Sequence, residues 1–135
     1  MKKMGSVVTL FIASVWVVFS AFKQVEEPSK MSKLMQQMLG FIKTEKENIA
    51  NGKEMQDYPR YFNKMKTAKV TEGKKLAENH KEFLTNFYEG LENYYKAGTT
   101  LERKESFNLL VNNCITCHQY ECPGPISTIQ KNIIE

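Results

Sequence analysis

The chain has 135 residues, a length that predicts a single domain. Charged residues make up 25% and aromatic residues 11% of the chain, a composition that fits a folded soluble body. The formal net charge of +4 is weak and dispersed, and there is no long run of like charges. The sequence therefore does not indicate a protein that binds nucleic acid.

The first residues have the layout of a secretory signal peptide. Lys2 and Lys3 form a short basic start, and residues 7–22 follow as an uncharged, mostly apolar run of 16 residues. A membrane-spanning helix needs about 20 such residues. We therefore expect residues 1–22 to be a signal peptide and residues 23–135 to be exported, to the periplasm or an equivalent compartment. No clean cleavage site follows the run, which leaves an uncleaved membrane anchor as the alternative.

After Pro28-Ser29, apolar residues recur mostly at three- and four-residue steps, which is the spacing of one helix face. They are Met31, Leu34, Met35, Met38, Leu39, Ile42 and Ile49. Proline and serine are typical of a helix start, and Asn51-Gly52 is typical of a helix stop. The first helix is therefore predicted over residues 29–51.

Two further helices are predicted in the middle of the chain. A shorter one begins at Asp57-Tyr58-Pro59, and its apolar face comprises Tyr61, Phe62, Met65 and Ala68, extended by Val70. The next one has a wide apolar stripe and ends at Gly98, a favoured residue just after a helix. The stripe comprises Leu76, Phe83, Leu84, Phe87, Tyr88, Leu91, Tyr94 and Tyr95.

The fourth helix is predicted to begin with a capping box, in which Thr99 is the cap and Glu102 stands three residues later. Cys122-Pro123-Gly124-Pro125 ends it, and a short extra helix with an isoleucine face is expected within 126–135. That face comprises Ile129, Ile133 and Ile134. Four amphipathic segments with short connections and no strand-like alternation predict an all-α domain over 23–135, an antiparallel four-helix bundle.

The last turns of the fourth helix carry Cys114-Ile115-Thr116-Cys117-His118, a C-x-x-C-H motif. Two thiols at this spacing can add across the two vinyl groups of a haem, and the histidine that follows can bind the iron. Helix positions i, i+3 and i+4 lie on one face, so all three side chains point the same way. The motif predicts one covalently attached haem c per chain, with Cys114 and Cys117 as attachment points and His118 as an iron ligand.

Two other kinds of site use C-x-x-C. A thiol–disulfide redox pair usually lies in a strand–helix–strand context, which the sequence does not show. A tetrahedral zinc site needs a second pair of ligands, and no second C-x-x-C or H-x-x-x-H is present. An exported chain with three cysteines also suits haem attachment, which uses two of them. Cys122 is left over, and the sequence assigns no function to it.

The sixth position on the iron decides what a haem would do. A methionine ligand would raise the reduction potential, whereas an apolar pocket would leave the iron able to bind a small gas. In an antiparallel bundle, the start of the first helix lies level with the end of the fourth. Met31, Met35 and Met38 are therefore candidate iron ligands, and Met35, the central one, is favoured. The alternative is that all three methionines only pack in the core. His80 stands in a polar stretch and is expected to be a solvated surface histidine.

With an export signal, a helical mature chain and C-I-T-C-H close to the carboxyl end, the sequence resembles the class II cytochromes c, the cytochrome c-prime family. The segment Leu34-Met35-Gln36-Gln37-Met38-Leu39-Gly40 is similar to the region where low-spin members place their axial methionine, and on this sequence that position is Met35. The resemblance implies a four-helix haem protein that transfers electrons with His118 and Met35 on the iron.

The expected function is therefore an electron carrier that serves redox partner proteins and is not an enzyme. The first alternative is a five-coordinate haem protein that binds nitric oxide or carbon monoxide. The second is a haem-free helical module that uses Cys114 and Cys117 as a dithiol. The sequence leaves a homodimer open, and it predicts membrane association only if residues 1–22 are retained.

Overall fold

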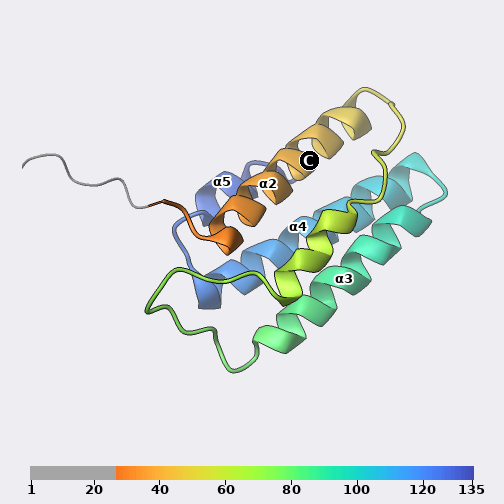
Figure 1. The fold of residues 1–135 in the computed structure, drawn as a ribbon. Helices are drawn as coiled ribbons and strands as arrows, with labels where there is room; N and C mark the ends of the chain where they lie inside the picture. Colours follow the sequence, from red (N-terminus) through yellow and green to blue (C-terminus); the bar gives the residue numbers. More distant parts are fainter. Residues whose placement is uncertain (1–26) are drawn as a thin grey trace, which may run out of the picture.

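The computed structural model describes residues 27–135, so the predicted signal peptide over 1–22 lies outside the described residues. The described elements are α2 (Lys30–Ala50), η1 (Arg60–Lys66), α3 (His80–Lys96), α4 (Thr100–Glu121) and α5 (Ile126–Gln130), where η1 is a 3-10 helix. This part of the chain contains no strand, so the all-α prediction is confirmed. Figure 1 shows α2 and α3 running in one direction, while η1 and α4 run in the opposite direction.

Helix α2 forms as the sequence predicts. The Ser29 hydroxyl caps it by accepting a 3.1 Å hydrogen bond from the Ser32 N–H. Four of its buried apolar side chains, Leu34, Met38, Ile42 and Ile49, belong to the predicted face. Phe41 is also buried, although the predicted face did not include it. The helix ends at Asn51-Gly52, where Gly52 has φ 62°, a backbone conformation that glycine adopts without steric cost.

The predicted second helix is present as η1, a 3-10 helix of only seven residues. Phe62 and Met65 are buried as predicted, but the predicted face ran on to Ala68 and Val70, which lie in the irregular segment after η1. There the backbone bonds to another element instead of continuing a helix, since the Met31 N–H donates to the Lys69 carbonyl at 3.0 Å. We call residues 67–79 the connecting segment.

The sequence predicted Leu76 to be part of the third helix. In the structure it lies in the connecting segment, and the residue is 43% exposed. Helix α3 begins only at His80. Gly73, at φ 76°, lies in a turn of this segment, so no helix runs through that position.

Helices α3 and α4 are joined by a tight turn, and the predicted capping box is present. The Thr99 hydroxyl accepts a 3.2 Å hydrogen bond from the Glu102 N–H, and the Glu102 carboxylate accepts a 3.0 Å bond from the Thr99 N–H. The two helices approach closely at Gly90, where a Cβ atom would lie 2.7 Å from the Asn113 side chain. A larger residue at this position would force the end of the Asn113 side chain to move.

Helix α4 ends at Glu121, directly before the predicted stop. The short helix α5 follows, with Ile129 buried and Ile133 and Ile134 half-buried against the core. The carboxyl end is held by Asn108 of α4, whose side chain donates to the Ile134 carbonyl at 2.8 Å and accepts from the Ile134 N–H at 2.9 Å. The predicted isoleucine face therefore does pack inward.

A buried polar cluster connects α2, α3 and α4 at the end of the molecule where α2 and α3 end and α4 begins. The Glu45 side chain is fully buried, and its carboxylate accepts hydrogen bonds from the Tyr94 hydroxyl and, at 3.0 Å, from Arg103. The Gln56 N–H and the Asn48 amide donate to its other oxygen at 2.9 and 3.0 Å. Every acceptor direction of this buried charge is therefore engaged, which is what makes its burial tolerable.

Candidate haem site

A cavity of about 300 Å³ lies at the end of the molecule where α2 and α3 begin and α4 ends. Its wall includes side chains from the first half of α2, from η1, from the connecting segment, from the start of α3 and from the last turns of α4. Most of these side chains are aliphatic, aromatic or methionine. Such a lining is typical of a cavity that takes a largely apolar small molecule.

The three motif residues line this cavity together. Cys114, Cys117 and His118 lie in the last two turns of α4, on the single helix face that their spacing predicts. Both cysteines are free thiols and half-buried, and the His118 residue is buried, at 8% exposure. The helix therefore presents two sulfur atoms and an imidazole to one enclosed volume.

The end of α4 fixes the orientation of the His118 ring. Its Nδ1 atom lies 3.1 Å from the carbonyl oxygen of Cys122 and 3.3 Å from the Cys122 sulfur. Cys122 takes up an extended conformation as the first residue after the helix, which turns its carbonyl back toward the ring. A carbonyl oxygen only accepts, so the geometry assigns the proton to Nδ1.

The other ring nitrogen of His118, Nε2, has no hydrogen-bond partner among residues 27–135. With the proton on Nδ1, Nε2 carries a lone pair. Metal-bound histidines in proteins almost always have this arrangement, in which the second ring nitrogen donates to a carbonyl or carboxylate. The chemistry of His118 therefore fits a metal ligand.

The two motif thiols are poorly suited to disulfide exchange in this structure. Burial, reinforced by the neighbouring Cys117, raises the pKa of the Cys114 thiol to about 12. Burial and the nearby Glu121 and Cys122 raise the pKa of the Cys117 thiol to about 11. Exchange proceeds through the thiolate, and reactive pairs have lowered pKa values. The folded chain therefore disfavours a catalytic dithiol.

The structure brings the predicted methionine to the same cavity. Met35, which is half-buried, lines the wall together with Met31 and Met38 from α2 and Met65 from η1. The start of α2 does lie level with the end of α4, as expected for antiparallel neighbours. Because four thioethers reach the wall, the assignment of Met35 as the iron ligand stays a prediction.

His80 is not the solvated surface residue that the sequence predicted. It lines the cavity, and its side chain is 17% exposed. Its Nδ1 atom lies 2.8 Å from a carboxylate oxygen of Glu121, which is itself 8% exposed. The two residues are 41 positions apart, and no local pattern in the sequence pairs them.

Glu121 also ties the connecting segment to α4. Both of its carboxylate oxygens accept from the Ala77 N–H, at 3.2 and 3.3 Å, and its backbone carbonyl accepts from the Lys74 ammonium. The residue therefore holds one wall of the cavity against the last turn of the helix that carries the motif. Sequence reasoning missed this role, because a lone glutamate near a helix end is usually solvated.

Comparisons with known protein families, with curated proteins and with solved structures found no match to this chain. None of the helices within residues 27–135 has both the length and the apolar character needed to cross a membrane. In the same part of the chain, no three His, Cys, Asp or Glu side chains are grouped to hold a metal ion.

Proposed function

We propose that this chain is an exported, monohaem c-type cytochrome that carries electrons between redox partner proteins. In this proposal the fold is an antiparallel four-helix bundle in which η1 and its flanks take the place of the second helix. One observation carries the proposal. Cys114, Cys117 and His118 line one cavity, and the His118 ring is held by Nδ1 with Nε2 left available.

The residues present suit a covalently held haem c. Each cysteine would add its S–H across one vinyl group to form a thioether, a step that needs no oxidant and releases no leaving group. His118 would bind the iron through Nε2, and Cys122 would hold the ring in place through its carbonyl. When bound, the haem supplies an iron that alternates between the ferric and ferrous states, which is one-electron chemistry.

The size of the cavity also has a consequence. About 300 Å³ is the lower end of the range for small-molecule sites, and a haem is a large ligand. The cavity would therefore have to widen on loading. Methionine side chains are flexible and the connecting segment is irregular, so these two parts of the wall are the ones expected to move.

Met35 would be the second residue to bind the iron, because α2 brings it to the cavity that His118 lines from α4. A histidine–methionine pair raises the reduction potential and leaves no open coordination position. The second candidate function is gas binding, and the wall also supports it. If the four methionines only pack, with Phe62 and Phe87 beside them, the iron keeps an open apolar face.

The test is the visible spectrum of the full chain, exported from a host that attaches haem to C-x-x-C-H motifs. The expected result is a covalent haem that is low-spin in both oxidation states and does not bind carbon monoxide. A high-spin ferrous form that binds carbon monoxide readily would exclude the methionine ligand and favour gas binding.

The matched control replaces both attachment points, as Cys114→Ala with Cys117→Ala. This variant is expected to lack covalent haem, so that any bound haem is released on denaturation. A stable, folded and colourless product from the unaltered chain would contradict haem binding altogether and support the dithiol alternative.

A further inference from the structure

The net charge of the whole chain is weak, but the charges of the described residues are not dispersed as the sequence interpretation held. Residues 60–81, which run from η1 into the first residues of α3, carry seven basic and two acidic side chains, a net charge of +5. The basic residues are Arg60, Lys64, Lys66, Lys69, Lys74, Lys75 and Lys81. The rest of residues 27–135 has nine basic and twelve acidic side chains, a net charge of −3. We call residues 60–81 the basic segment.

The positive charge of the basic segment is not cancelled by close ion pairs. The ion pairs that involve a lysine or arginine within residues 27–135 are Lys33–Glu27, Lys96–Glu92 and Arg103–Glu45, and all three lie outside the segment. Lys66 lies over the Tyr88 ring, 4.7 Å from its centroid, and Lys74 donates to a backbone carbonyl. Neither contact removes charge, and all seven basic side chains are exposed.

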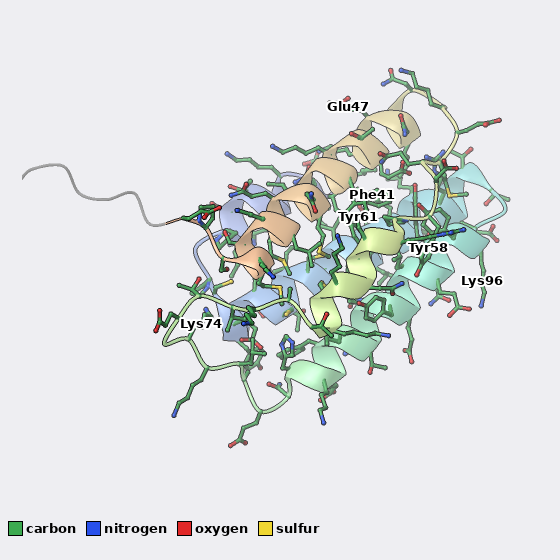
Figure 2. All side chains as sticks on the ribbon, viewed as in Figure 1. Phe41, Glu47, Tyr58, Tyr61, Lys74 and Lys96 are labelled. Carbon is green, nitrogen blue, oxygen red and sulfur yellow. The ribbon has the colours of Figure 1, made fainter. Side chains whose placement is uncertain are left out.

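The basic segment also contributes exposed residues to the wall of the cavity. Thr71, Lys74 and Leu76 are exposed, yet they line the cavity that contains the motif residues. Figure 2 shows Lys74 on the loop at one end of the molecule, with Lys96 and Glu47 at the other end. A group held in the cavity would therefore lie beside exposed residues of the segment where the local charge is most positive.

We propose that the basic segment is the docking surface for an acidic redox protein that exchanges one electron with the group held in the cavity. This surface presupposes the proposed function. Electron tunnelling slows steeply with distance, so a partner has to dock where the cavity wall is thinnest. Complementary charge then steers the encounter and fixes its orientation, while the contact area can stay small.

The test compares two double variants of the haem-loaded chain with the same net charge. Lys69→Glu with Lys75→Glu alters the basic segment at two exposed side chains outside the cavity wall. Lys43→Glu with Lys53→Glu makes the same change at exposed positions of α2 and the loop after it. The probes are reduced flavodoxin, an acidic one-electron donor, and hexacyanoferrate(III), a small anionic oxidant.

Stopped-flow rates at low ionic strength are expected to fall about tenfold for both probes in the first variant and much less in the second. Added salt should slow the unaltered chain and remove the difference between the variants. Equal losses in the two variants would show that only net charge matters, and would overturn the docking surface. Unchanged rates in the first variant would also overturn the docking surface.

Vesicles of anionic phosphatidylglycerol separate a membrane role from a protein partner. If Lys69→Glu with Lys75→Glu abolishes vesicle binding but leaves the flavodoxin rate unchanged, the surface faces lipid and the proposal is wrong. The failure of the proposed function would be visible earlier, since a chain without covalent haem is colourless. A coloured chain with equal rates contradicts the docking surface alone.

Discussion

The imidazole of His118 is held by the backbone of Cys122, four residues further along the chain. Nδ1 of the ring lies 3.1 Å from that carbonyl oxygen, and the Cys122 sulfur lies 3.3 Å from the same nitrogen. The carbonyl contact depends on the end of α4 and not on the identity of the side chain. The sulfur contact depends on the side chain, so the two contacts can be separated by mutation.

Cys122→Ala should keep the carbonyl contact and remove only the sulfur. We expect covalent haem to be retained and the reduction potential to shift by less than about 59 mV, which is a tenfold change in a one-electron equilibrium constant. Potentiometric titration of the two proteins checks this. Loss of haem in Cys122→Ala, with attachment surviving in Cys117→Ala, would mean that the attachment cysteine has been misassigned.

Met35→Ala should expose the sixth position of the iron. We expect a high-spin form that binds carbon monoxide, and a reduction potential lowered by on the order of 0.1 V, within the roughly 0.8 V that axial ligands span. Visible spectra and potentiometry measure both changes. Met31→Ala is the matched control, since it lines the same cavity from the same helix. A low-spin spectrum in Met35→Ala would show that Met35 does not bind the iron.

Glu45→Ala should destabilise the fold strongly, because it leaves Arg103, whose side chain is 12% exposed, without its carboxylate. Removing one partner of a buried ion pair costs about 3 kcal/mol or more. Urea denaturation measures the change. The control is Glu47→Gln on the same helix, where the side chain is exposed and the free energy of unfolding should barely change.

The same carboxylate should make stability depend on pH. Burial acts to raise the pKa of Glu45, but hydrogen bonds from Tyr94, Gln56 and Arg103 outweigh burial, and the pKa lies below its ordinary value of 4.5. A carboxyl group with a lowered pKa in the folded state stabilises the fold above pH 4.5. That contribution is lost as pH falls from 4.5 through the folded pKa. Denaturation curves between pH 7 and 3 should show a smaller acid loss in Glu45→Gln.

Glu121→Ala should release the connecting segment from α4. The substitution leaves the Ala77 N–H and the His80 ring without their acceptor, at a cost of about 1–3 kcal/mol. Hydrogen exchange over residues 67–79 and trypsin cleavage at Lys74 and Lys75 should become faster, while the α3–α4 turn stays protected. Glu105→Ala, at an exposed position of the same helix, is the control. Equal exchange in both variants would contradict this anchoring role.

Much of the helical fold could be predicted, because its signals are local. Ser29 and Thr99 mark the starts of α2 and α4 as caps, and the proline pair after Cys122 marks the end of α4. The motif residues share a face because they lie within five positions of one helix. Short-range spacing and capping chemistry suffice for features of this kind.

The parts that could not be predicted depend on contacts between distant residues. The chain after η1 stays irregular because Lys69 bonds to Met31, and His80 is drawn inward by Glu121. Glu45 occupies the core face between Ile42 and Ile49, but a charged residue there is expected to be solvated unless a partner is known. Its partner Arg103 is 58 residues away.

The enclosure of the motif thiols sets an order of events for maturation of the proposed cytochrome. Both thiols line a cavity of about 300 Å³ that would have to widen to admit a haem, so attachment is expected while the connecting segment is open. Helices α3 and α4 are adjacent in sequence and pair through a short turn, whereas α2 and the connecting segment join them through distant contacts. In this proposal a newly exported chain would present its thiols on a formed hairpin, and the attached haem would become the surface on which the remaining helices assemble.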